Sequence, residues 1–343
     1  MEAPLPHPSG IPIAQRVRAP IELSIPSPRH QLLWRALRDE DDAQLVSLIS
    51  SQDDVQESAV NMLTPLLIGL HQVVAGQPGA SLGGFDRAGV MRAAGILHLW
   101  PKSNTVVLHG VVDPAWSGRG IGGSLMAWQE GKGRQILASL PGSGRARMLS
   151  YTGESAANRR RLLMAAGFSP ARSLYKTRRD LGAPIEHHEL PDGLEWRSLT
   201  DVDTEALRLT HNAATREAWA PGPVYRELWD RRWSEYLPEL SAVAFDPGEE
   251  RIAGYALALM EAPTSTMAPR SEVYIHRLAV SLGYRGRGLG RALTSRVLEQ
   301  SAAGGRRFSA ITIDPAMNHS GWPMFEQFGF APASRTIVYG LDL

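Results

Sequence analysis

Two stretches of the sequence, 118–123 and 286–291, combine alternating glycines with arginine. In both, a run typical of a β-strand stops and a helical pattern begins. Glycine permits a positive φ and lets a ligand come close to the main chain. The first N–H groups of a helix, at the positive end of its dipole, attract anions. Each stretch therefore predicts a turn that can hold a pyrophosphate.

The first of these turns also has the spacing of a dinucleotide-binding fingerprint, through Gly118, Gly120 and Gly123. That fingerprint needs an acidic residue about 20 positions further on. The stretch 136–147 has no Asp or Glu, and the second turn has Arg291 in place of the third glycine. Both observations disfavour a nicotinamide or flavin site. A tight turn without any ligand is the simpler alternative, and two turns in matching places disfavour it.

The elements that position the turns occur twice, because the sequence contains an internal repeat. Three pairs of short motifs recur at the same offset of 162 residues, and the two glycine turns lie 168 residues apart. A shared register of this kind indicates a duplicated domain. The paired motifs are Trp34–Leu37 with Trp196–Leu199, Gly167–Phe168 with Gly329–Phe330, and Asp180–Leu181 with Asp342–Leu343.

The repeat predicts a flexible leader at 1–28, a first domain at 29–181, a linker at 182–193 and a second domain at 194–343. The linker contains two prolines and two glycines and has no periodicity. Strands alternate with helices, which indicates an α/β or α+β fold. Strands are expected at 93–100, 105–112, 252–260 and 272–280, and helices at 124–137 and 292–300.

Composition excludes several classes of function. The net charge of +1 disfavours a nucleic-acid partner, and no long apolar run predicts a membrane span. The chain has no cysteine, so disulfides, thiolate metal sites and a cysteine nucleophile are excluded. Its ten histidines lack metal-ligand spacing, so no metal site is expected. These features favour a cytoplasmic protein.

The second turn, Arg285–Gly290, has the Q/R-x-x-G-x-G/A pattern of the GNAT acetyltransferase superfamily. The first turn keeps Gly120 and Gly122, but Ser117 stands in the Q/R place. The resemblance covers roughly Pro28 to Leu343. It implies two tandem GNAT-like domains, each a mixed, mostly antiparallel sheet flanked by helices. The chain resembles tandem members of the superfamily, of which mycothiol synthase is one, and the tandem acetyltransferase of an antibiotic cluster such as that for clavulanic acid is a further suggestion.

The resemblance implies contacts with acetyl-CoA, or with another acyl-CoA, as cosubstrate. Pantetheine would pair with the strand before each turn, where neighbouring strands splay apart. Pyrophosphate would sit on the main-chain amides of the turn, with arginine charge nearby. The implied cofactor-binding residues are Val111, Val112, Arg119, Gly120, Ile121, Gly122, Gly123, Ala279, Val280, Arg285, Arg287, Gly288, Leu289, Gly290, Arg291 and Asn318.

Acyl transfer to an amine needs a base, and the second copy offers one on the strand at 272–280. Alternation places Glu272, Tyr274 and His276 on one face of that strand, although packed side chains of these types are also common. Glu261 is another candidate. Many members of the superfamily carry a tyrosine as acid four residues before Gly-Phe; Phe325 and Leu163 stand there.

Two further features lie outside the turns. The stretch 219–236 has Trp219, Tyr225, Trp229 and Trp233, which predicts either an amphipathic core helix or a lid over the acceptor. The run Arg159–Arg161 predicts a solvated helix face or a contact with the 3′-phosphate of CoA.

The sequence therefore predicts an acyl-CoA-dependent N-acyltransferase that acetylates an amine of a small molecule. The amine attacks the thioester directly, because no cysteine can carry the acyl group. We expect the first domain to hold acetyl-CoA as structure and the second to catalyse. The alternative is a non-catalytic acyl-CoA-binding or regulatory module. Acceptor identity, acyl length and the choice between monomer and homodimer stay open.

Overall fold

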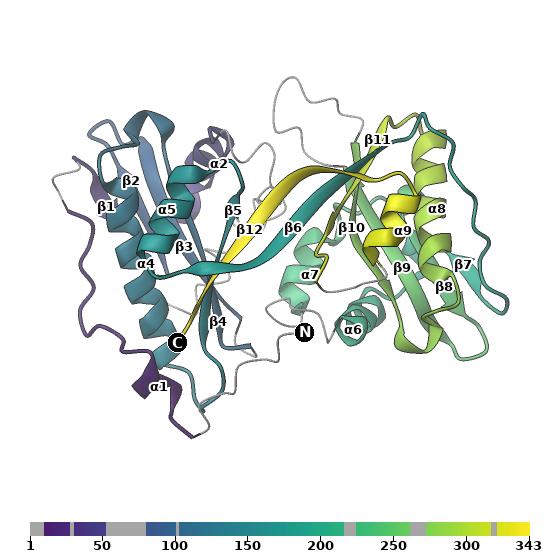
Figure 1. Ribbon diagram of the computed structural model, residues 1–343, viewed down its shortest axis with the longest axis horizontal. Helices are drawn as coiled ribbons and strands as arrows, with labels where there is room; N and C mark the ends of the chain where they lie inside the picture. The colour runs from purple at the N-terminus through teal and green to yellow at the C-terminus, as the bar shows by residue number, and fades with distance from the viewer. Residues whose placement is uncertain are drawn as a thin grey trace. The chain divides into compact units, whose positions relative to one another are not determined.

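A computed structural model describes residues 10–27, 31–52, 80–100, 103–215, 224–260, 272–316 and 321–343. The chain forms two compact units. Unit 1 comprises Met1–Ser173 and Arg335–Leu343, and unit 2 comprises Leu174–Ser334 (Figure 1). No helix among the described residues is long and apolar enough to cross a membrane.

Unit 1 is built on one mixed sheet. Its neighbours pair antiparallel, except that the fourth and fifth strands run parallel. In spatial order the strands are β1 (Leu33–Arg35), β2 (Ser81–Phe85), β3 (Met91–Trp100), β4 (Thr105–Val112), β5 (Arg147–Gly153) and β12 (Ala331–Asp342).

Helices cover both faces of this sheet. The long helix α4 (Ile121–Ala138) and α5 (Ala157–Ala165) lie on one face, and α2 (Asp42–Ser50) packs against β3 from the other (Figure 1). The main apolar core forms under α4, where Leu97 and Leu125 are almost fully buried.

The described part of the expected leader is not loose. A short helix, α1 (Ile13–Arg16), packs against α4, and the side chains of Ile13 and Val17 are fully buried. Arg134 of α4 donates a 2.6 Å hydrogen bond to the carbonyl of Val17. The many prolines of this segment led to the prediction of a flexible leader. The buried side chains of Ile13 and Val17 were not predicted.

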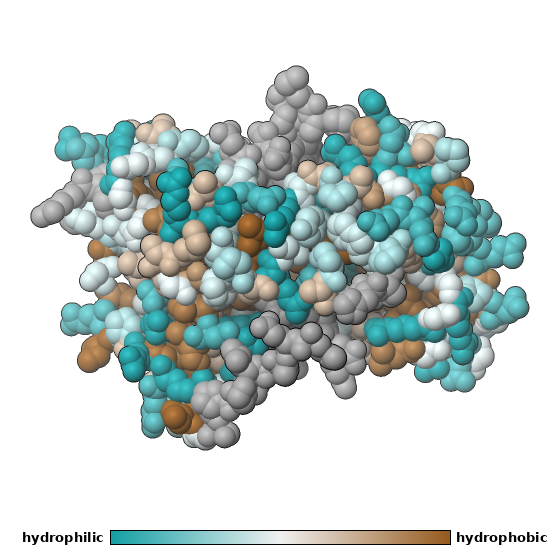
Figure 2. Space-filling model, viewed as in Figure 1, coloured by the Kyte–Doolittle hydropathy of each residue, from teal (hydrophilic) through white to brown (hydrophobic). Residues whose placement is uncertain are grey.

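Unit 2 repeats the architecture. Its strands in spatial order are β6 (Ser169–Asp180), β11 (Phe308–Ile313), β10 (Glu272–Val280), β9 (Arg251–Met260), β8 (Ala242–Asp246) and β7 (Glu195–Arg197), and only β10 and β11 are parallel neighbours. Its helices are α6 (Thr204–Ala214), α7 (Arg226–Trp233), α8 (Leu289–Ala303) and α9 (Gly321–Gln327). The visible surface over α8 is mostly hydrophilic (Figure 2).

The compact units cross the boundaries of the sequence repeat. Strand β6 ends the first repeat, yet it pairs antiparallel with β11 of unit 2. Strand β12 ends the second repeat, yet it pairs antiparallel with β5 of unit 1. The division therefore differs from domains at 29–181 and 194–343. Equivalent strands of the two copies can occupy the same place in a sheet. The repeat therefore predicts the order of elements within each copy, but it does not determine which copy supplies the last strand of each unit.

The expected linker, 182–193, belongs to unit 2. Ile185 and Leu190 pack against the core of that unit, and the ring of His188 lies 5.4 Å from the ring of Phe328, centroid to centroid. The segment is irregular, as its prolines and glycines predict, but it is held by side-chain contacts.

Candidate active site

The two glycine turns have nearly the same backbone. Gly118 and Gly120 have φ of 78° and 80°, and Gly286 and Gly288 have φ of 77° and 83°. Helices α4 and α8 begin directly after these turns, and no side chain caps the first turn of either helix. Main-chain N–H groups at both helix starts are thus available to an anion, the arrangement that the sequence predicted.

The strands part beside each turn. Strands β4 and β5 pair only as far as Leu108 and Ser150, and β10 and β11 only as far as Ile275 and Ile311. Strand β4 stays paired with β3 to its end, and β10 with β9. The predicted splay is therefore present in both units. The four residues predicted to pair with pantetheine, Val111, Val112, Ala279 and Val280, lie beyond the points of separation.

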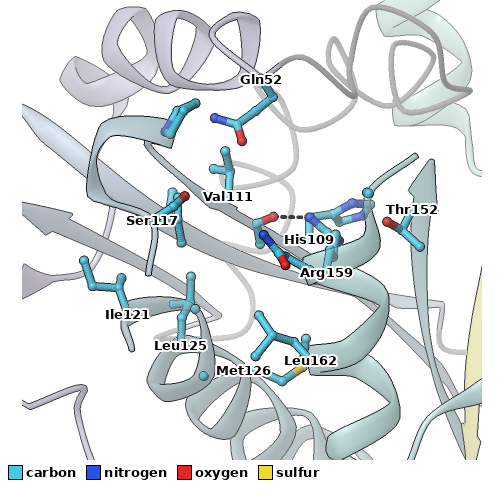
Figure 3. A pocket seen from close by; sticks show the side chains of 18 of the residues that line it. Gln52, His109, Val111, Ser117, Ile121, Leu125, Met126, Thr152, Arg159 and Leu162 are labelled. Carbon is cyan, nitrogen blue, oxygen red and sulfur yellow. Dashed lines mark hydrogen bonds between the residues drawn. The ribbon is translucent and has the colours of Figure 1, made fainter. Parts of the chain in front are cut away.

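A cavity of about 870 Å³ opens at the turn of unit 1 (Figure 3). Arg159 of α5 reaches the point where the strands part, where it donates to the carbonyl of Gly110 and to the hydroxyl of Ser150. The cavity brings together most of the predicted cofactor residues of this unit, namely Val111, Val112, Gly120, Ile121, Gly122 and Gly123. Arg119 instead lies 4.5 Å from the ring centroid of Trp116.

Strand β10 differs from β4 by a β-bulge. The register between β10 and β9 shifts between Ile275 and Arg277, whereas β4 pairs with β3 without a shift. A bulge changes the direction of a side chain, and bulges are frequent beside active sites. Here His276 contacts α7 and the segment after it, whereas Arg277 contacts α6 and the same segment. Strict alternation did not predict that Arg277 would join His276.

His276 has a partner at each ring nitrogen. Its Nδ1 lies 2.7 Å from the hydroxyl oxygen of Tyr236, and its Nε2 lies 3.0 Å from a guanidinium nitrogen of Arg232. A guanidinium can only donate, so Nε2 accepts and the imidazole proton is on Nδ1. Burial, together with Arg277 and Arg232, lowers the pKa of His276 well below its usual value. The imidazole is therefore neutral near pH 7.

Arg277 extends this cluster. It donates from Nε to the Tyr236 hydroxyl at 3.0 Å and from another nitrogen to Nε2 of His211 at 2.8 Å. By the same donor rule, His211 carries its proton on Nδ1, which lies 2.5 Å from the Tyr255 hydroxyl. Burial, then Arg277, lowers the pKa of His211 to about 2. The Arg277 guanidinium also lies 5.1 Å from the ring centroid of Trp229.

The Tyr236 hydroxyl oxygen accepts from two donors, the Nδ1–H of His276 and the Nε–H of Arg277. Its own hydrogen is therefore directed toward neither of them. Burial raises the pKa of Tyr236, although Arg277 opposes the rise. Tyr236 thus keeps its proton near pH 7 and has that proton to donate. Tyr236 is the last residue of the stretch 219–236, for which the sequence predicted either a core helix or a lid over the acceptor; its position beside β10 follows only from the fold.

The other two predicted catalytic residues lie on the same strand. Glu272 is buried and forms ion pairs with Lys176, at 2.9 Å, and with Arg178. Both cations come from β6, the strand contributed by the first repeat. Tyr274 is also buried, and its ring centroid lies 6.3 Å from that of His276.

Arg285, predicted to bind the cofactor, has main-chain partners. It donates to the carbonyl of Ala214 at 2.7 Å and to the carbonyl of Val280 at 3.3 Å. Its side chain therefore ties the turn to the last residue of α6. The Arg287 guanidinium lies 5.7 Å from the ring centroid of Tyr284.

The remaining predicted site residues lie at the start of α8, in the two apolar cores, or outside the described residues. Gly288 caps α8, and Leu289, Gly290 and Arg291 form its first turn. Phe325 and Leu163 are buried in the two cores. Asn318, Glu261 and Trp219 lie outside the described residues.

The turns, the splayed strands and the sheet order define the class of this protein. The sequence profile of the acetyltransferase (GNAT) family matches residues 204–330. A mycothiol acetyltransferase from Streptomyces avermitilis is 31% identical over 241 residues, which is 67% of this chain and 69% of that protein. The chain belongs to the GNAT acetyltransferase family and is a tandem N-acetyltransferase.

Other relatives support the tandem form. A mycothiol acetyltransferase from Thermobispora bispora is 29% identical, with 70% of this chain and 76% of that protein covered. A GCN5-related N-acetyltransferase from Sphaerobacter thermophilus has the same fold, with a TM-score of 0.63 at 20% identity over 91% of this chain and 96% of that one. A tandem GNAT protein from the clavulanic acid biosynthesis pathway has a TM-score of 0.65 at 17% identity, over 91% and 98%.

Proposed function

We propose that this enzyme transfers an acetyl group from acetyl-CoA to an amine of a small molecule, and that unit 2 catalyses the transfer. Unit 1 holds an acyl-CoA without turning it over. The bulge in β10 carries the proposal, because it brings the half-buried side chains of His276 and Arg277 into one hydrogen-bonded cluster in the unit that has the complete glycine turn. Several relatives similar to this chain are mycothiol acetyltransferases, which supports acetyl transfer.

The reaction has two proton movements. The amine nitrogen attacks the thioester carbon and loses a proton, while the C–S bond breaks and the thiolate takes a proton. Unit 2 offers three groups on or beside β10 for these steps: the carboxylate of Glu272, the neutral imidazole of His276 and the hydroxyl of Tyr236. We assign the base to Glu272, because the only lone pair of the neutral His276 ring already accepts from Arg232. We assign proton donation to Tyr236, because Phe325 stands where many relatives have a tyrosine.

Unit 1 has poorer means for the same chemistry. Strand β4 has no bulge. The side chain of Arg159 donates a hydrogen bond to the carbonyl of Gly110 where β4 and β5 part, so that carbonyl is already paired. His109 is buried, and burial lowers its pKa to about 3. These features support binding without turnover.

A matched pair of variants tests the assignment. Gly288→Glu and Gly120→Glu place the same side chain at equivalent positions with φ of 83° and 80°. The backbone strain is therefore alike, and in both turns the added charge repels pyrophosphate. We expect Gly288→Glu to abolish thiol release with a panel of amines and Gly120→Glu to retain it. Circular dichroism of both variants checks that they are folded.

The second candidate is the non-catalytic acyl-CoA-binding module, favoured by Phe325 and Leu163 at the tyrosine positions. It predicts tight CoA binding with no thiol release from the unaltered protein and any amine. Loss of activity in Gly120→Glu alone would instead assign catalysis to unit 1.

A further inference from the structure

The cavity of unit 1 extends past the turn to the sheet face covered by α2. A Cβ on Gly95 would meet Leu125 of α4 at 2.9 Å, so Gly95 faces α4. Side chains alternate along a strand, and Ala94 and Ile96 therefore face the opposite side. Both line the cavity, together with Leu45 and Ile49 of α2. These four aliphatic side chains form a recess between α2 and β3, which we call the α2 recess.

The equivalent face of unit 2 is polar. At the repeat offset of 162 residues, Ile49 corresponds to His211. His211 belongs to the cluster of unit 2, where it accepts from Arg277 and contacts Tyr255. The same place in the fold thus holds an aliphatic side chain in one unit and a hydrogen-bonding imidazole in the other. The recess suits a hydrocarbon group better than an amine.

Polar residues such as Gln52 also line the cavity, and the one closest in register to the recess is His109. It lies opposite Ile96 in the register of β3 and β4 and lines the same cavity. Burial and the nearby Arg159 keep its imidazole uncharged near neutral pH. An uncharged ring tolerates an apolar neighbour, so His109 does not prevent a hydrocarbon chain from entering the recess.

We propose that unit 1 binds an acyl-CoA whose acyl group is an apolar chain longer than acetyl, with the chain in the α2 recess. This inference rests on the proposed function, because the glycine turn of unit 1 must bind CoA. Each further methylene buried there is expected to tighten binding about fourfold.

The full-length Gly288→Glu variant tests the inference, because its unit 1 turn is unaltered. Isothermal titration with CoA, acetyl-CoA, butyryl-CoA and hexanoyl-CoA measures affinity against chain length. We expect butyryl-CoA to bind about 16-fold tighter than acetyl-CoA, since it has two more methylenes. Native mass spectrometry verifies that one ligand is bound.

Filling the recess should remove the effect of chain length. Ala94→Leu adds bulk from the strand, and Ile49→Phe adds it from the helix. In either variant, combined with Gly288→Glu, we expect the three acyl-CoAs to bind alike while unacylated CoA keeps its affinity. Retained CoA binding shows that the variant is folded, and Ala94→Ser, which adds little bulk, should keep the dependence.

The outcomes separate the inference from the function beneath it. Equal affinities for all four ligands in Gly288→Glu would overturn the inference and leave CoA binding by unit 1 intact. No binding by Gly288→Glu, with binding by Gly120→Glu, would overturn both. A dependence on chain length found in Gly120→Glu but not in Gly288→Glu would assign the preference for longer acyl chains to unit 2 and so contradict the inference.

Discussion

The Nδ1 atom of His276 lies 2.7 Å from the hydroxyl oxygen of Tyr236, and this contact joins the bulge of β10 to the segment after α7. Two arginines fix its direction. Arg232 donates to the other ring nitrogen, and Arg277 donates to the same hydroxyl oxygen. The proton between the two residues therefore belongs to His276, and the proton of Tyr236 is left for another acceptor.

Removing that hydroxyl should affect turnover more than binding. We expect Tyr236→Phe to lower kcat by about 100-fold, the lower range for a positioned acid or base, with KM for acetyl-CoA unchanged. Tyr284→Phe is the matched control, because its hydroxyl bonds Asp246 and Arg251 instead. Steady-state kinetics over a range of pH supply the measurement. An unchanged kcat in Tyr236→Phe would remove Tyr236 from the reaction.

Variants of Arg285 and Arg287 should distinguish effects on acceptor binding from effects on CoA binding. Arg285 holds the carbonyl of Ala214 at the end of α6, the helix that carries His211. We expect Arg285→Gln to raise KM for the amine and to lower Tm, with little change in CoA affinity. Arg287→Gln should weaken CoA binding severalfold. Titration calorimetry and kinetics on both variants decide, and a large loss of CoA affinity in Arg285→Gln would count against this role.

Stability should fall as pH drops from neutral. Burial lowers the pKa of His98 to about 4, whereas an unfolded histidine has a pKa of about 6.5. Between these values the unfolded chain binds more protons, so protonation favours unfolding. From pH 6.5 to 5 we expect about 1.5 kcal/mol of stability to be lost per histidine of this kind. Urea titrations measure it, and His98→Phe should have the flatter dependence on pH.

Local signals predicted much of the fold. The strand at 105–112 matches β4, and the strand at 272–280 matches β10. Apolar and β-branched runs specify such buried strands without help from distant contacts. The turns were also predictable from the sequence, because glycine is the residue that commonly takes the positive φ found at Gly120 and Gly288.

The features that escaped prediction depend on contacts between distant parts of the chain. The bulge at His276 is set by its partner strand, so the alternation of residues within β10 could not indicate it. Arg285 matches a phosphate-binding pattern by type, yet its partner is a carbonyl 71 residues away. Tyr236 ends the stretch 219–236, but its role depends on neighbours in β10, which the sequence could not indicate.

The exchange of strands predicts that the two halves of the sequence fold only together. Residues 1–181 include β6 but lack β11, its partner, and they also lack β12, which covers the edge of β5. An uncovered strand edge favours aggregation. We expect fragments 1–181 and 182–343 to be unfolded or aggregated when expressed singly, and to give a stable 1:1 complex when expressed together. Size-exclusion chromatography and circular dichroism of each fragment and of the pair are the measurements.

A milder perturbation of the same exchange is to remove the side chain of Arg145, which forms an ion pair with Asp342 of β12 at 2.8 Å. Arg145→Ala in the complex should change Tm only slightly, because that pair is exposed. A single fragment that is monomeric and natively folded would show that the exchanged strands are dispensable.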